Sequence, residues 1–71
     1  MMKIDETQRI AAELKELRQK RGLTLRALEE LSGVPNPNIA KIEKGTHSPS
    51  IRTLSSLTKA LGARIELVSE D

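Results

Sequence analysis

The feature that most constrains the fold is the stretch of residues 24–45, in which two short helical patterns flank the pair Gly33-Val34. Leucine recurs every third residue before this pair, and Ile39 and Ile42 follow it three residues apart. Such spacings place apolar side chains on one face of a helix. Glycine readily adopts the left-handed conformation that ends a helix. Two helices joined by a tight glycine turn form a helix-turn-helix, a motif whose second helix can enter the DNA major groove.

Two further amphipathic helices are predicted, one on each side of this pair. Apolar side chains recur at i, i+4 and i+7 within residues 6–21, and at three- and four-residue intervals within residues 50–61. Thr24 is expected to cap the second helix and either Ser48 or Ser50 the fourth, because a hydroxyl oxygen accepts a bond from an N–H of the first turn. The sequence therefore predicts an all-α fold, a single domain over residues 1–71 with helices at about 6–21, 24–32, 36–44 and 50–61.

The last segment of the chain changes its hydrophobic period. Residues 63–69 alternate apolar and polar side chains, which is typical of a β-strand. A lone strand leaves its backbone groups unpaired, and no second strong strand pattern precedes it. We therefore expect this strand to pair with its own copy across a two-fold axis and build a homodimer, with pairing to residues 2–4 as the weaker alternative. The residues expected in this dimer strand are Arg64, Ile65, Glu66, Leu67 and Val68.

The composition excludes several functional classes. The 71 residues include no cysteine and a single histidine, His47, so neither a disulfide nor a common zinc site is expected. There is no aromatic residue, which argues against binding of single-stranded nucleic acids, whose bases stack on aromatic rings. Because no catalytic pair or phosphate-binding glycine loop is recognisable, we expect no enzyme activity, no cofactor and no metal. No apolar run is long enough to span a membrane, and the lack of cysteine fits the cytoplasm.

Charge is distributed unevenly along the chain, although the net charge is only +2. Residues 36–64 carry five basic side chains against one acidic side chain, Glu43. Residues 65–71 carry three acidic side chains and no basic one. A basic central segment followed by an acidic tail favours a polyanionic partner that approaches from one face.

One set of residues, spread over about two-thirds of the chain, carries a family resemblance. Its members are Leu17-Arg18, Arg21-Gly22-Leu23-Thr24, Leu28, Gly33-Val34, Ile39, Ile42-Glu43-Lys44-Gly45, Pro49-Ser50, Leu54 and Ala60-Leu61-Gly62. Together they resemble the lambda-repressor-like, Xre/Cro-type helix-turn-helix family over the stretch from about Leu14 to Leu61. The predicted strand after the last helix is similar to that of the antitoxin members, the HipB-like and HigA-like groups, in which it builds the dimer.

This resemblance implies a function as well as a fold. It implies a lambda-repressor-like domain that binds a double-stranded DNA operator as a homodimer and regulates transcription, most simply as a repressor. An alternative is the antitoxin of a toxin-antitoxin module, which would bind a toxin protein and repress its own operon. It also implies a partly buried ion pair between Arg18 and Glu43 that ties the first helix to the third.

The expected DNA-contacting residues surround the third helix. The amides of Asn36 and Asn38 suit adenine, and Lys41 suits guanine or a phosphate. The alternative is helix capping by either asparagine and a solvated lysine. Pro37 has two interpretations, contact with a thymine methyl group or stiffening of the turn. Expected base contacts are Asn36, Pro37, Asn38 and Lys41, and expected phosphate contacts are Thr24, Arg26, Lys44, Thr46, His47 and Ser48.

Three features depart from the family pattern. Leu25 stands where most members have a glutamine that contacts phosphate, so the contact at this end must rely on Thr24, Arg26 and backbone amides. Glu29 stands where members usually have a small residue. Members usually have serine or glutamine around positions 35 to 37, where this chain has Pro35 and Pro37, which remove backbone donors.

Overall fold

The computed structural model describes residues 5–70 and contains four helices in this part of the chain. Each helix agrees with its predicted range to within one residue at either end. The predicted ranges are slightly longer because they included capping residues, which stand just outside the helical hydrogen-bond pattern. The helices are α1 (Glu6–Lys20), α2 (Leu25–Ser32), α3 (Asn36–Glu43) and α4 (Ile51–Ala60).

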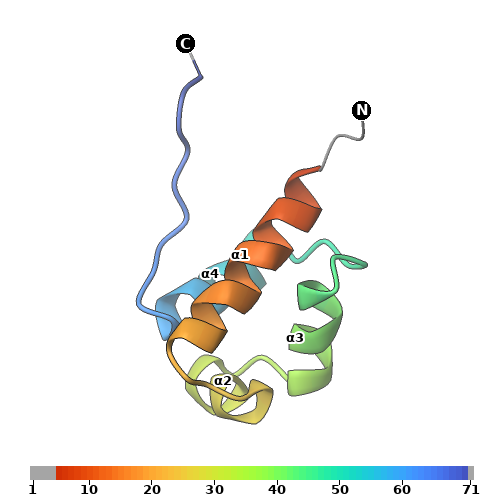
Figure 1. The fold of residues 1–71 in the computed structure, drawn as a ribbon, viewed down its shortest axis with the longest axis vertical. Coiled ribbons are helices and arrows are strands. Elements are labelled where there is room, and N and C mark those ends of the chain that lie inside the picture. Colours follow the sequence, from red (N-terminus) through yellow and green to blue (C-terminus); the bar gives the residue numbers. More distant parts are fainter. Residues whose placement is uncertain (1–4, 71) are drawn as a thin grey trace.

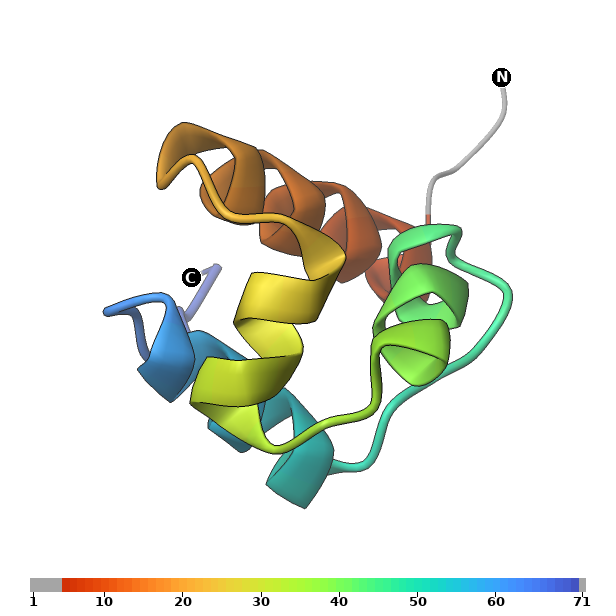
Figure 2. The same cartoon turned by 90° about the horizontal axis from the view of Figure 1, so that it is seen from below.

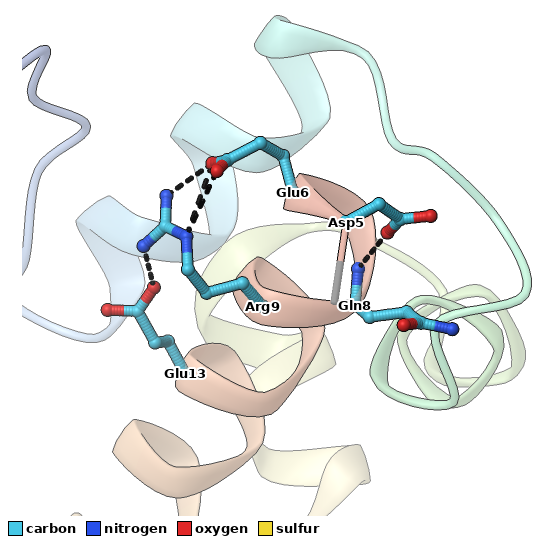
Figure 3. Close-up of polar contacts among 5 residues, drawn as sticks. All are labelled: Asp5, Glu6, Gln8, Arg9 and Glu13. Carbon is cyan, nitrogen blue, oxygen red and sulfur yellow. Dashed lines mark hydrogen bonds and ion pairs between the residues drawn. The ribbon is translucent and has the colours of Figure 1, made fainter. Parts of the chain in front are cut away.

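Short polar side chains begin three of the helices. The Asp5 carboxylate accepts a hydrogen bond of 2.9 Å from the Gln8 N–H (Figure 3). The predicted cap at Thr24 is present, since its Oγ1 accepts from the Ala27 N–H at 3.0 Å. For α4 the cap is Ser50, the second of the two predicted possibilities, whose Oγ accepts from the Thr53 N–H at 3.1 Å. Each bond satisfies one backbone donor that has no partner within its helix.

The helices enclose one apolar core. α2 lies at the centre of the view in Figure 2 and packs against both α3 and α4, while α1 packs against α3. Gly33 ends α2 with a φ of 80°, a left-handed conformation that lets the chain turn directly into α3. The core is built from most of the apolar positions predicted from the helical spacing, together with Val34 of the turn, namely Ala11, Leu14, Leu28, Val34, Ile39, Ile42, Leu54, Leu57 and Leu61. Two members of the predicted repeats do not join it, since Leu31 at the end of α2 is 61% exposed and Ile51 at the start of α4 is 71% exposed.

The C-terminal segment after α4 forms no strand in this single chain. Residues 63–70 leave the end of α4 and run as an irregular segment along one side of the molecule (Figure 1). An open groove separates this segment from α1 and α4. No second strand lies beside the predicted strand 63–69 among residues 5–70, because the predicted partner belongs to a second chain. The weaker alternative, pairing with residues 2–4, falls outside the described residues.

None of the helices in residues 5–70 is long and apolar enough to cross a membrane.

Candidate nucleic-acid interface

A partly buried ion pair fixes α3 against the rest of the domain. The Arg18 Nε donates to Glu43 Oε2 at 2.7 Å, and Arg18 Nη2 donates to Glu43 Oε1 at 3.0 Å. The side chains are only 13% and 7% exposed. A third bond runs from Arg18 Nη1 to the Leu23 carbonyl oxygen at 2.8 Å. The end of α3 is therefore tied both to α1 and to the loop before α2, and the hydrogen bond to Glu43 raises the pKa of Arg18.

The start of α3 is held by Glu29, for which the sequence predicted no role. Glu29 Oε1 accepts from the Asn36 backbone N–H at 3.2 Å and from Asn36 Nδ2 at 2.6 Å. The N-cap position is Pro35, and no side chain of α3 caps the helix itself. The alternative in which Asn36 or Asn38 caps this helix is therefore wrong. A carboxylate across the turn does so instead, and carboxylates are favoured at helix N-termini.

The outer face of α3 carries the remaining candidates for base contacts. Ile39 and Ile42 point into the core, whereas Pro37, Asn38 and Lys41 are exposed. Asn36 is half-buried because Glu29 holds it. The arrangement leaves a polar amide and a lysine ammonium group on the solvent side of a rigidly anchored helix.

The loop after α3 adds polar side chains to the same region. Asn38 and Lys41 line one shallow open hollow together with His47 and Ser48 of this loop. Thr46 Oγ1 donates to the Lys41 carbonyl oxygen at 3.2 Å, which ties the loop to the end of α3. The fold thus brings residues predicted to contact bases and residues predicted to contact phosphate to one surface.

The predicted phosphate contacts form two groups, one on each side of α3. Thr24 and Arg26 are exposed at the start of α2. Lys44, like the loop residues 46–48, is exposed where α3 ends. In both ribbon views α3 lies between the start of α2 and this loop (Figures 1 and 2). Two groups of polar and basic side chains that flank a helix suit the two phosphate strands bordering a major groove.

Another charged cluster lies on α1 and is balanced rather than basic. Arg9 Nη1 bonds Glu13 Oε2 at 2.7 Å, and the same guanidinium pairs with Glu6 (Figure 3). The hydrogen bond from Arg9 lowers the pKa of Glu6 and raises that of Arg9. Because its positive charge is already paired with two carboxylates, this surface is a poor candidate for phosphate binding.

Comparison with known proteins identifies the family. The family HTH_3, described as helix-turn-helix, matches residues 14–68. A relative from Haemophilus influenzae, named as an uncharacterised HTH-type transcriptional regulator, is 43% identical over 68 residues, which is 92% of this chain and 69% of the relative.

Solved structures give similar results. The chain is similar to an HTH_3 family transcriptional regulator from Vibrio cholerae, with a TM-score of 0.77 and 42% identity over 80% of this chain; the match spans 32% of that longer protein. It is also similar to a chain in a toxin-antitoxin module from Streptococcus pneumoniae. There the TM-score is 0.70 and the identity 38%, covering 86% of this chain and 68% of the other.

Proposed function

Because this chain belongs to the HTH_3 helix-turn-helix family, we infer that it is a DNA-binding transcriptional regulator. The observation that carries this inference is the anchoring of α3. Buried isoleucines and the Arg18–Glu43 ion pair fix its inner side, while Asn38 and Lys41 remain exposed on its outer side. A helix held in this way can present base-reading side chains in one fixed orientation to the major groove.

We assign base reading to α3 and backbone contact to the segments that flank it. Asn38 suits the N6 and N7 atoms of adenine, and Lys41 suits the acceptors of guanine. Pro37 stiffens the first turn and can also meet a thymine methyl group. Contacts to phosphate come from both flanks of α3, and the residues proposed are Thr24, Arg26, Lys44, Thr46, His47 and Ser48.

The regulator is proposed to act as a homodimer on a palindromic operator. Leu67 is 97% exposed and Val68 is 79% exposed, which is unfavourable for large apolar side chains in water. Pairing of residues 64–68 with the same segment of a second copy would satisfy both the backbone groups and these side chains. Two copies would then present their α3 helices to successive major grooves about 34 Å apart, an arrangement suited to repression.

The dimer can be tested with a single charge. We expect Leu67→Asp to shift the protein from dimer to monomer in sedimentation equilibrium, because it places a carboxylate in the proposed strand pair. Ile51→Asp is the matched control, since Ile51 is also an exposed apolar residue but lies at the start of α4. A wild-type protein that is monomeric at all concentrations, or equal dissociation by both variants, would contradict the proposed strand.

The proposed function is tested by DNA binding to the region upstream of the protein's own gene. We expect tight binding that resists competitor DNA, and much weaker binding to a random duplex of equal length. Lys41→Ala should relax base preference, whereas Lys44→Ala should lower the affinity for all DNA sequences by a similar factor. If Lys41→Ala instead weakens every sequence equally, its assignment as a base-reading residue is wrong.

A second candidate function is supported by the similarity to the toxin-antitoxin module. In this alternative the protein would bind a toxin protein with its folded surface and also repress its own operon. The same binding experiment separates the two candidates in part. Equally weak binding to both duplexes would favour a protein partner, and a search for the toxin would then begin with the neighbouring gene.

A further inference from the structure

The first turn of α3 has every backbone donor accounted for within the protein. Pro35 and Pro37 have no N–H group, and the Asn38 N–H bonds the Pro35 carbonyl oxygen at 3.0 Å. The remaining donor, the Asn36 N–H, bonds Glu29 Oε1 at 3.2 Å. This helix end therefore offers no backbone N–H to DNA phosphate. Any contact that its first turn makes with DNA must come from side chains.

Glu29 also holds the side chain of Asn36, in the first turn of α3. Its Nδ2 lies 2.6 Å from Glu29 Oε1, and its Oδ1 makes no hydrogen bond to the described residues. A carboxylate can only accept hydrogen bonds, so the amide must turn its nitrogen, not its oxygen, toward Glu29. The flipped amide would bring two oxygens together and lose the bond. Glu29 therefore selects one of the two orientations of the Asn36 amide.

The selected orientation leaves a defined pattern on the Asn36 side chain. Oδ1 remains as an acceptor and Nδ2 keeps one hydrogen to donate, because the other is used by Glu29. An adjacent acceptor and donor are complementary to N6 and N7 of adenine in the major groove. Without Glu29 the amide could rotate freely and would lose orientational entropy on each encounter with a base.

We propose that Glu29 is a positioning residue for base recognition, which fixes the Asn36 amide so that it reads adenine at one position of the operator. Glu29 touches no base in this role and acts through Asn36. The proposal rests on the proposed function, since it names how one residue of the same surface acquires its base preference. It also gives a role to the charged residue that departs from the usual small side chain at this position.

The test begins with sites selected by the wild-type protein from a random duplex library. Each base pair of the best site is then replaced, and affinity is measured by fluorescence anisotropy. In Asn36→Ala, the preference for A·T over other base pairs, which is normally roughly 5- to 150-fold, should be lost at one position of the site. Glu29→Ala should lose most of the preference at this same pair and little at others, whereas Glu29→Gln, which keeps an acceptor, should retain it. Glu30→Ala is the matched control, because Glu30 is the exposed neighbour on α2.

A second measurement follows the Asn36 side-chain amide by NMR in the absence of DNA. The two Nδ2 protons should be unequally shifted in the wild-type protein and in Glu29→Gln, and the inequality should shrink in Glu29→Ala. If Glu29→Ala fails to fold, Glu29→Met removes the acceptor while keeping the length of the side chain.

The outcomes separate the two proposals. A library that yields no enriched sequence overturns the proposed function, and the adenine reading with it. If the library yields enriched sites but Glu29→Ala weakens binding to every sequence equally, the proposed function holds and the positioning role is wrong. Glu29 would then only cap α3.

Discussion

Replacing Arg18 with alanine is expected to remove about 3–5 kcal/mol from the free energy of unfolding, a large part of what a domain of this size possesses. The substitution leaves the Glu43 carboxylate, whose side chain is 7% exposed, without its cation. The Leu23 carbonyl oxygen loses its donor as well. Urea denaturation followed by circular dichroism at 222 nm measures the loss, and a variant that is unfolded without denaturant fits the same expectation.

The matched control is an arginine on the same helix. Arg9→Ala breaks two ion pairs with Glu6 and Glu13, but these lie on the exposed side of α1, where water and salt screen them. Its denaturation midpoint should barely change. The double variant Arg18→Met with Glu43→Leu should regain much of the stability lost by Arg18→Ala, because it leaves no buried charge. Equal effects of Arg18→Ala and Arg9→Ala would show that burial of the first pair contributes nothing.

The pH dependence of this contribution follows from the direction of the pKa shift. The bond to Glu43 raises the pKa of Arg18 in the folded state. A raised pKa contributes stability that is fully present below the unfolded value and is lost only as the pH rises through the folded value. Arginine titrates far above neutrality, so its part of the stabilisation should be constant from about pH 6 to pH 9.

Local spacing was sufficient to predict the helices but not the contacts between them. Repeats of three and four residues identified the buried faces, and Thr24 followed from its place before an apolar repeat. The Arg18–Glu43 pair, whose members are 25 residues apart, followed from the family resemblance rather than from any spacing rule. No such rule relates Glu29 to Asn36 across a turn, or Arg21 Nε to the Leu61 carbonyl oxygen at 2.9 Å, which joins the ends of α1 and α4.

The contact between Glu29 and Asn36 involves the residues that depart from the family pattern. Glu29 replaces a small residue, and two prolines flank Asn36. Only the structure shows that these changes belong together, since the prolines remove donors and the carboxylate satisfies the one that remains. The C-terminal strand predicted at 63–69 is absent from the single chain for a different reason. Its hydrogen-bond partners are expected in a second copy, and residues 5–70 of a single chain contain no second strand beside which it could pair.

The other large effect is expected in the salt dependence of DNA binding. Among the proposed phosphate contacts, the cationic side chains are Arg26 and Lys44, and both are exposed in each chain. A dimer would therefore neutralise about four phosphates, and its affinity should fall by roughly 100-fold between 50 and 200 mM salt. A plot of log K against log salt concentration gives a slope of about −0.9 for each neutralised phosphate.

Removal of one proposed phosphate contact should change this slope by a countable amount. Lys44→Ala deletes one cation from each chain and two from a dimer, so the slope should become shallower by about 1.8. Lys59→Ala is the control, since it removes the same charge from the last turn of α4. This turn lies on the opposite side of the molecule from α3 (Figures 1 and 2). The control should leave the slope almost unchanged, because counterions are released only where cations meet phosphates.

If both variants shift the slope equally, net charge alone governs binding and Lys44 makes no phosphate contact. If Lys44→Ala shifts it by only about 0.9, one copy of the chain binds the DNA, and the proposed dimer does not form on the operator.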